Sequence, residues 1–576
     1  MNDETTTIPS LEDWQHWALV TAQANQLIME AWAENLTKAK SMPGFGLQLP
    51  QATNDPMAWM TAGAEAWSKG LDAWSQMLGQ YGAAAETKDR RFSSPEWREN
   101  PIFDTVRQSY QAISQKLLGT VEDIEGLDEP ARDRLRFATK GFVDAMSPAN
   151  FMATNPEVMK RTVETKGENL LAGLRNMLAD ISRGQVTQSP EGAFELGRNL
   201  AITPGKVIYE NRLFQLIQYA PSTEEVLETP LVVFPPWINR FYILDLTPEK
   251  SFVKWTVDQG VSLFMVSWKS ADETIRDVTM DDYVAAQDEA IDVIRDLLGV
   301  KSVNAIGYCV AGTTLAATLA YLAAKGEAEK VSSATFFTAQ VDFEDPGDLK
   351  MFVGDETLST LKQLTAETGV LDGRVMAATF NLLRGKDLIW NYVVNNYLMG
   401  NDPPPFDLLH WNGDVTNLPG DWHRDYLQRL YRENLLMQPG AIKVKNVPID
   451  LSKVETPAYI QAGREDHIAP APSVWKLTKV LAGPKRFVLA GSGHIAGVVN
   501  PPSAGKYQYW TNDEPASTLE DFVAGATEHK GSWWPDWIQW LKSQAPGTVK
   551  ATGARVPGAG KLKPVEDAPG RYVRAR

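Results

Sequence analysis

The amino-acid sequence predicts an α/β protein whose mainly parallel sheet is covered by helices on both faces. From about residue 203 onward, short apolar runs alternate with helical stretches. Continuous apolar strands separated by helices are typical of parallel sheets that are buried on both sides. One apolar run, residues 303–308, leads through a turn that contains Cys309 into an Ala-rich helical stretch. This strand, turn and helix are the element around which we expect the chain to be organised.

Composition and charge restrict the class of protein. The chain has 576 residues, of which 43% are hydrophobic and 22% charged, so we expect a globular protein with more than one domain. Its single cysteine excludes an intrachain disulfide framework and a Cys-based zinc site. A net charge of -16 argues against general nucleic-acid binding. No apolar run approaches the roughly 18 residues of a transmembrane helix, and the acidic start is unlike a signal peptide, which favours the cytoplasm.

The first 190 residues or so are expected to form an all-helical domain. Apolar residues recur there at helical spacing, among them Trp14, Trp32, Trp59 and Trp67. Packing within the same protein accounts for this pattern. The alternative is an exposed stripe that binds an apolar partner or surface.

The remainder, residues 191–576, is expected to be a second domain built on the sheet. Between about 342 and 454 the alternation of strands and helices breaks, and the stretch is rich in aromatic and loop residues. We interpret it as a cap inserted over the site, and residues 545–576, rich in Gly, Pro and Lys, as an extended tail. The expected strands are 207–209, 213–219, 231–234, 261–268, 303–308, 334–338, 458–462 and 486–489; the expected helices include 248–259, 283–298 and 313–325.

Cys309 occupies the nucleophile position of a sharp turn between strand and helix. The stretch G-Y-C-V-A-G is similar to the nucleophile-elbow pattern G-x-S-x-G, with Cys in place of Ser and Ala311 in place of the second Gly. A thiol is an effective nucleophile only as thiolate, so Cys309 requires a base.

Partners for Cys309 follow the last two expected parallel strands. Asp466 comes after strand 458–462, and His494 after strand 486–489. The order nucleophile, acid, base is that of α/β-hydrolase folds. The sequence therefore predicts a Cys309–His494–Asp466 triad in an α/β-hydrolase fold with a cap insertion. His467 is the competing base, but two neighbours on an extended loop point in different directions.

The oxyanion of acyl transfer needs backbone donors. The N–H of Val310, directly after the nucleophile, is one candidate. A second is expected from the loop P-P-W-I-N-R after strand 231–234, and we assign it to Ile238. No H-E-x-x-H or comparable cluster occurs, so no metal is expected.

Eight separated motifs along nearly the whole chain are similar to those of one enzyme family. The resemblance is to polyhydroxyalkanoate synthases, the polyester polymerases of bacterial storage granules, and that family's catalytic Cys, Asp and His match Cys309, Asp466 and His494. Ala311 is a departure from the family pattern, in which Gly is frequent. The motifs are D-R-R-F-S-S-P-E-W-R-E-N-P, T-P-G-K-V-I-Y-E-N, P-P-W-I-N-R-F-Y-I-L-D-L, G-Y-C-V-A-G, W-N-G-D-V-T-N-L-P-G, G-R-E-D-H-I, G-H-I-A-G-V-V-N-P-P and G-S-W-W-P-D-W.

The resemblance implies a class I enzyme that works as a homodimer without a second type of subunit. Its substrate would be an (R)-3-hydroxyacyl-CoA, chiefly 3-hydroxybutyryl-CoA, which it would polymerise through an acyl-cysteine thioester with release of CoA. No cofactor is implied beyond the coenzyme A that the substrate carries. The enzyme would act in the cytoplasm at the granule surface, and the helical region would bind that surface, the growing polyester or granule-coating proteins, or support the dimer.

Two other functions compete with this interpretation. A thioesterase or depolymerase-type hydrolase would use the same triad with water as acceptor, and would release free hydroxy acid. A granule-associated structural protein with an inactive catalytic domain would release no CoA. Fold-level analogy alone does not separate these three.

Overall fold

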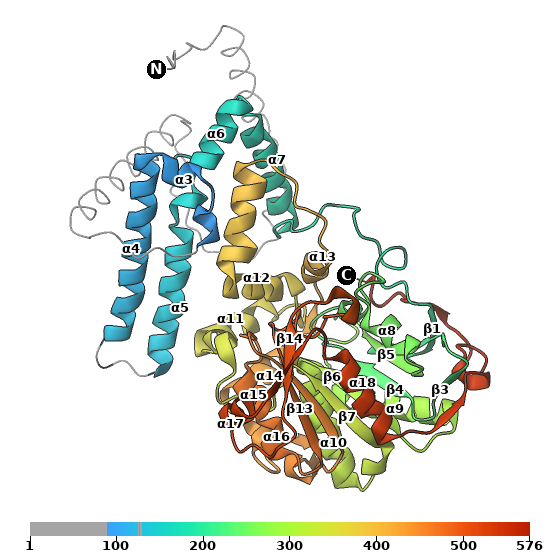
Figure 1. Cartoon of the computed structure of the whole chain (residues 1–576). Helices are drawn as coiled ribbons and strands as arrows, with labels where there is room; N and C mark the ends of the chain where they lie inside the picture. The colour runs from blue at the N-terminus through green and yellow to red at the C-terminus, as the bar shows by residue number, and fades with distance from the viewer. Residues whose placement is uncertain (1–88, 125, 127–128, 576) are drawn as a thin grey trace. The chain divides into compact units, whose positions relative to one another are not determined.

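The chain divides into two compact units. The computed structural model describes residues 89–575, apart from residue 125 and residues 127–128. Of these, the helical unit comprises residues 89–190 and 380–404, and the sheet unit comprises residues 191–379 and 405–575 (Figure 1). The Trp-rich helical stretches expected before residue 88 lie outside the described residues.

The described part of the N-terminal region is helical, as the sequence predicts. Asn100 begins α4 by accepting the N–H of Ile102, and Asn155 caps α6 in the same way, because these helix ends have N–H groups without an intrahelical acceptor. A small core around Trp97 and Tyr110 joins the first elements. The helices are α3 (Glu96–Glu99), α4 (Pro101–Asp123), α5 (Glu129–Ala145), α6 (Pro156–Glu164) and α7 (Glu168–Arg183).

Residues 380–404 belong to the helical unit, although the sequence assigned them to the cap over the site. Two π-helical turns, η6 (Lys386–Trp390) and η7 (Val393–Leu398), form the middle of this segment. Asn169 Nδ2 donates to Leu398 O at 2.7 Å, and Tyr397 Oη donates to Asp180 Oδ2 at 2.7 Å. The expected cap of residues 342–454 is thus divided between the two units.

The main sheet has eleven strands among the described residues. Its order is β15-β14-β13-β12-β7-β6-β4-β5-β2-β1-β17. The pairs from β13 to β5 are parallel, and the strands added at both sides are antiparallel. The strands are β1 (Gly205–Glu210), β2 (Phe214–Tyr219), β4 (Leu231–Phe234), β5 (Leu263–Trp268), β6 (Val303–Tyr308), β7 (Val331–Phe337), β12 (Ala458–Gly463), β13 (Lys485–Ala490), β14 (Gln508–Thr511), β15 (Thr527–Lys530) and β17 (Glu566–Asp567).

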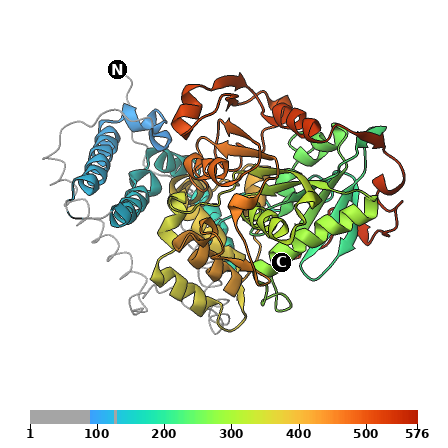
Figure 2. The same cartoon turned by 90° about the horizontal axis from the view of Figure 1, so that it is seen from below.

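Helices cover both faces of this sheet (Figures 1 and 2). On one face, α8 (Phe252–Asp258) and α18 (Trp534–Gln544) contribute to one core with alternate strand residues such as Leu231 and Val233. The helices α9 (Met280–Leu298) and α10 (Val310–Lys325) pack together against β4 and β6. Because successive strand side chains point to opposite faces, this arrangement buries every residue of β4 and β6.

The insertion between β7 and β12 packs its aromatic residues next to the end of β4. Trp422 and Tyr426 lie against Trp237, which follows β4, with ring centroids 5.3 and 5.2 Å apart. The part of the expected cap that remains in the sheet unit therefore lies next to the carboxyl end of β4. Its helices are α11 (Asp355–Leu364), the first residues of α12 (Gly373–Leu383), α13 (Asp407–Gly413) and α14 (Gly420–Tyr426).

Residues 545–575 do not form the extended tail that the sequence suggests. The short strand β16 (Thr548–Lys550) pairs with β3 (Glu225–Leu227), and β17 forms one edge of the main sheet. Val573 is 1% exposed and belongs to the main core. The Gly and Pro residues of this segment serve turns between short packed elements, which is why composition alone suggested an irregular tail.

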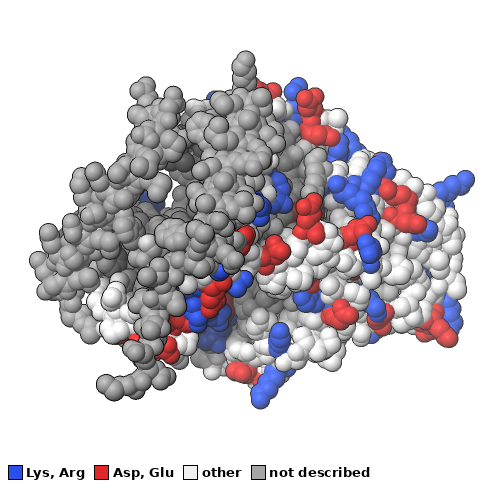
Figure 3. Space-filling view, turned by 90° about the horizontal axis from the view of Figure 1, so that it is seen from above, with Lys and Arg blue, Asp and Glu red and all other residues white. Residues whose placement is uncertain are grey.

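Charges of both signs are interspersed on the face in Figure 3, where blue and red side chains alternate over the described residues. Within residues 89–575, no helix is both long enough and apolar enough to span a bilayer.

Candidate active site

Cys309 lies at a strained turn between β6 and α10. Its backbone has φ 54° and ψ -127°, a conformation that residues other than glycine rarely adopt. Its N–H donates to Phe337 O of the neighbouring strand at 2.9 Å, which fixes the turn. The residue directly precedes the first residue of α10, so the turn lies at the N-terminus of that helix.

Two glycines permit the close crossing of strand and helix at this turn. A Cβ atom on Gly307 would lie 2.5 Å from Gly312 Cα, and one on Gly312 would lie 2.4 Å from Ala339 Cβ. The departure at Ala311 is therefore accommodated, because the close approach occurs one residue later. Ala311 itself is fully buried in the first turn of α10.

The loops that carry Asp466 and His494 are joined through their backbones. The strands β12 and β13 are parallel neighbours, so their carboxyl ends lie side by side. Beyond the strands, Arg464 N–H donates to Ala490 O at 2.8 Å, and Glu465 N–H donates to Ser492 O at 3.0 Å. These bonds continue the register into the loops and bring the acid and the base together.

His494 and Asp466 form a hydrogen-bonded pair in which Asp466 is buried and the side chain of His494 is 10% exposed. His494 Nδ1 lies 2.7 Å from Asp466 Oδ2, and the other carboxylate oxygen accepts the N–H groups of Ile468 and Ala469 at 2.8 and 2.9 Å. Burial alone would lower the pKa of His494, but the charges of Asp466 and Cys309, together with hydrogen bonds to both, raise that pKa well above its usual value. A proton on the imidazole is therefore stabilised from both sides, by Asp466 and by Cys309.

His467, the competing base of the sequence analysis, has a different set of contacts. Its carbonyl accepts the N–H of Asp348 at 3.2 Å, in the first part of the insertion. The carboxylate of Asp466 is hydrogen-bonded to His494 and to backbone N–H groups. This geometry favours His494 as the base.

The two predicted oxyanion donors lie on neighbouring strand ends. Phe234, the last residue of β4, pairs with Gly307 of β6, so the loop that contains Ile238 begins beside the turn at Cys309. Val310 is the first residue of α10, where N–H groups have no intrahelical acceptor. These positions suit both residues for the role, which stays a prediction.

Two tyrosines of the insertion approach Cys309 and were not identified from the sequence. Tyr426 and Tyr431 are buried, and burial together with the charge of Cys309 raises the pKa of both. Gln340 Nε2 donates to Tyr431 Oη at 3.3 Å. The only sequence signal for them was the aromatic richness of the insertion, which does not distinguish site residues from core.

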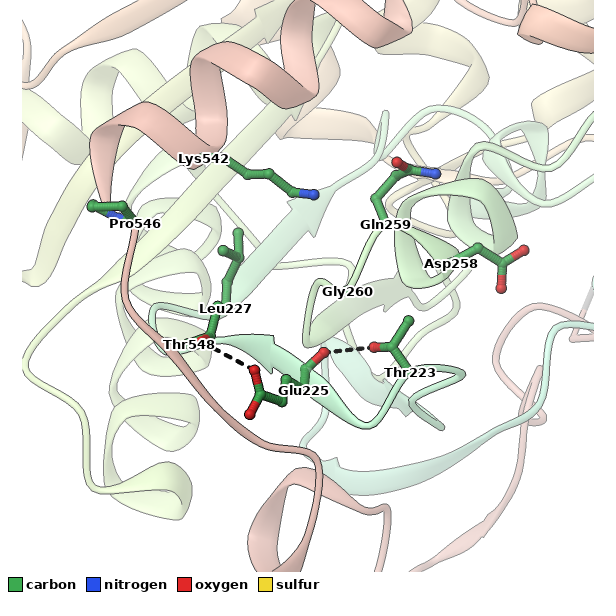
Figure 4. Close-up of a pocket in the computed structure, with 9 residues that line it drawn as sticks. All are labelled: Thr223, Glu225, Leu227, Asp258, Gln259, Gly260, Lys542, Pro546 and Thr548. Atoms are coloured by element: carbon green, nitrogen blue, oxygen red, sulfur yellow. Dashed lines mark hydrogen bonds between the residues drawn. The ribbon is translucent and has the colours of Figure 1, made fainter.

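The structure also has a pocket that none of Cys309, His494 and Asp466 lines; Figure 4 shows its lining residues. Gly260 comes just before β5 and Leu227 just before β4, so the pocket is at the edge where the parallel strands begin. Cys309, Asp466 and His494 all lie at the opposite side of the sheet, where the parallel strands end. The pocket is lined by Thr223, Glu225, Leu227, Asp258, Gln259, Gly260, Lys542, Pro546 and Thr548.

The sheet order, the turn at Cys309 and the Asp–His pair place this chain in the class of proteins with an α/β-hydrolase fold. The model of the family described as "alpha/beta hydrolase fold" matches residues 262–501. A thermophilic esterase from Thermogutta terrifontis overlaps with a TM-score of 0.32 at 9% identity, over 59% of this chain and 99% of that structure.

Within this class, the chain belongs to the poly(3-hydroxyalkanoate) polymerases. The model described as "Poly-beta-hydroxybutyrate polymerase (PhaC) N-terminus" matches residues 88–256. The poly(3-hydroxyalkanoate) polymerase subunit PhaC of Cupriavidus necator is 46% identical, over 87% of this chain and 86% of the relative. The poly(3-hydroxyalkanoate) polymerase of Methylorubrum extorquens is 42% identical, over 99% of both chains. The resemblance noted in the sequence is thereby confirmed.

Proposed function

We propose that this protein polymerises (R)-3-hydroxyacyl-CoA, chiefly 3-hydroxybutyryl-CoA, through an acyl thioester on Cys309. Its family makes it an acyltransferase that joins hydroxyacyl units into a polyester. The catalytic assignment rests on one observation: His494 Nδ1 lies 2.7 Å from Asp466 Oδ2, and both residues follow parallel strands that end on the same side of the sheet as the turn at Cys309.

The first half-reaction acylates the cysteine. His494 takes the proton from Cys309, and the sulfur attacks the thioester carbonyl carbon. The N–H groups of Val310 and Ile238 hold the oxyanion of the tetrahedral intermediate. The intermediate collapses with cleavage of the bond to the CoA sulfur, which leaves with the proton from His494 and gives acyl-Cys309. No cofactor takes part other than the coenzyme A carried by the substrate.

The second half-reaction forms the ester bond. A hydroxyl group of another acyl unit gives its proton to His494, and its oxygen attacks the carbonyl carbon of acyl-Cys309. Cys309 leaves as thiolate, and the polyester is longer by one unit. Asp466 is the less suitable base, because its side chain is fully buried and its oxygens accept bonds from His494 and from the backbone. Its role is to orient the imidazole and to stabilise the imidazolium.

Cysteine suits this reaction for an energetic reason. Exchange between two thioesters is nearly balanced, so acyl-Cys309 keeps the activation needed for the ester bond. That activation is useful only if water does not reach the intermediate. The aromatic residues of the insertion, including Trp422, Tyr426 and Tyr431, pack over the strand ends and supply such a barrier.

The test measures CoA release from (R)-3-hydroxybutyryl-CoA and insoluble polyester in the same reaction. Cys309→Ala and His494→Gln should abolish both, whereas the matched control His467→Gln should keep activity within about threefold of wild type. Release of CoA with only soluble hydroxy acid would identify a thioesterase. Full activity of Cys309→Ala would refute the nucleophile assignment.

We further propose that the enzyme works as a homodimer at the granule surface in the cytoplasm, with granule-coating proteins as candidate partners. Support comes from exposed apolar side chains on the helical unit, such as Ile102, Phe142 and Val163. Replacing these three by Ser should lower the fraction of enzyme that sediments with polyester granules, while CoA release in solution stays unchanged. Light scattering of the purified chain tests the dimer.

A further inference from the structure

Arg240 is a buried arginine just beyond the predicted oxyanion donor Ile238. Its side chain is 2% exposed, and Nε lies 3.6 Å from Asp414 Oδ1. Its guanidinium also donates to three carbonyl oxygens: Nη2 to Val415 O at 2.9 Å and to Ala575 O at 2.7 Å, and Nη1 to Tyr572 O at 3.3 Å. Burying a guanidinium is costly unless it is paired with a charge and hydrogen-bonded, and the ion pair with Asp414 together with the three carbonyl contacts offsets that cost and restrains the side chain.

The carbonyl groups that Arg240 binds belong to segments that are themselves anchored. Tyr572 N–H donates to Gln215 Oε1 at 3.1 Å, and Tyr572 Oη donates to Asn211 O at 2.8 Å. The next residue, Val573, lies in the main core. On the insertion side, Asp414 Oδ2 accepts the hydroxyl of Tyr242 at 2.9 Å. Arg240 therefore connects three separate parts of the sheet unit.

The loop between β4 and Arg240 is held at both ends and contains Ile238 between them. At its start, Trp268 Nε1 donates to Pro235 O at 2.8 Å. At its end, Trp411 Nε1 donates to Arg240 O at 2.7 Å. The loop begins beside the turn at Cys309, because β4 and β6 are parallel neighbours in register. The position of the Ile238 N–H thus depends on how firmly Arg240 is held.

We infer that Arg240 is a positioning residue for the oxyanion: it ties residues 572–575 and the insertion to the loop that presents the Ile238 N–H. This inference rests on the proposed acyl transfer at Cys309. Oxyanion donors act only if they are preorganised at the place where charge develops. Loosening Arg240 should therefore slow attack on a thioester while leaving the thiol, His494 and Asp466 intact.

The test compares two reactions of the full-length chain at Cys309, the only cysteine of the sequence. One is CoA release from (R)-3-hydroxybutyryl-CoA, which forms an oxyanion. The other is alkylation by iodoacetamide, which uses the thiolate and its base but forms no oxyanion. In Arg240→Lys, which keeps the charge but loses the planar set of donors, we expect kcat for CoA release to fall roughly ten- to hundredfold. The alkylation rate and KM should stay within about threefold of wild type.

Arg555→Lys is the matched control. Arg555 is also buried and also binds carbonyl groups: Nη1 donates to Leu227 O at 3.2 Å, and Nη2 donates to Glu228 O at 2.6 Å. These acceptors precede β4, at the edge of the sheet opposite Cys309. Its substitution should lower thermal stability about as much as Arg240→Lys and leave kcat for CoA release unchanged.

Equal losses of CoA release and alkylation in Arg240→Lys would overturn the inference, because they would indicate general damage to the site. Unchanged CoA release would overturn it as well. If Arg240→Lys does not fold, Tyr572→Phe is used in its place. This substitution removes only the hydrogen bond from Tyr572 Oη to Asn211 O. It should lower kcat for CoA release several-fold and leave the alkylation rate unchanged. Absence of CoA release by the wild-type chain would instead refute the proposed function, and the inference with it.

Discussion

The contacts inside the helical unit differ in kind from the contacts inside the sheet unit. In the sheet unit, apolar strands and the helices α8 and α18 form one large core. In the helical unit, the segment 380–404 is attached by polar side chains that bind backbone groups, such as Asn169 to Leu398 O and Asn396 to Thr187 O. Apolar side chains there remain exposed, including Val163 at 75%. The difference teaches that the site is set in one large apolar core, while the helical unit combines a small apolar core with directional polar bonds to residues 380–404.

The largest effect is expected from Gly312→Ala in the sheet unit. The added methyl group would lie 2.4 Å from Ala339 Cβ and 2.8 Å from Gly307 O, so strand and helix must separate at the turn that holds Cys309. We expect a loss of about 1–3 kcal/mol in the free energy of unfolding, and a fall of tenfold or more in CoA release. Thermal denaturation and the CoA assay measure the two. Wild-type values in both would show that the turn tolerates such a shift.

Gly173→Ala is the corresponding change in the helical unit. A Cβ atom there would lie 1.8 Å from Tyr397 O, in the segment 380–404. We expect residues 380–404 to become susceptible to limited proteolysis while the alkylation rate of Cys309 is kept. Gly141→Ala in α5 is the matched control, because nothing lies within 4 Å of its Cβ and alanine favours a helix. Equal proteolysis of the two variants would contradict the contact.

Substitutions of two buried aspartates, Asp466 in the sheet unit and Asp180 in the helical unit, should affect different properties: the first the titration of His494, the second the stability of the fold. In Asp466→Asn the lost negative charge should lower the pKa of His494, which Asp466 raises in the wild type, so the imidazole loses its proton at lower pH. Imidazole NMR signals followed against pH measure this shift. Asp180→Asn, which weakens the bond from Tyr397 Oη, should lower stability by about 1–3 kcal/mol and leave that titration in place. A titration of His494 unchanged by Asp466→Asn would contradict the pairing.

The smallest effect is expected from Val163→Ser. The side chain of Val163 is exposed in the single chain. Its replacement should therefore change the free energy of unfolding by no more than about 0.5 kcal/mol. Denaturant unfolding measures it. A clear loss of stability at low protein concentration would show that Val163 is covered in the isolated chain.

Much of the sheet unit was predictable because its pattern is local. Each expected parallel strand is present, because a short apolar run that is bounded by turn residues and separated by helical stretches is typical of a buried strand. The antiparallel strands β14 and β15 were not identified. Residues 527–530 read T-E-H-K and carry no apolar alternation, so their strand conformation comes from pairing with β14.

The sequence by itself determined the family, the fold and the candidate triad, because Cys309, Asp466 and His494 have distinctive chemistry and follow recognisable strands. Only the tertiary structure decided that residues 380–404 join the helical unit, that residues 545–575 complete the sheet, and that Arg240 meets Tyr572 and Ala575. The physical reason is common to all three. These contacts join residues more than 150 positions apart, and most use backbone carbonyl oxygens, which every residue possesses and no sequence pattern reveals.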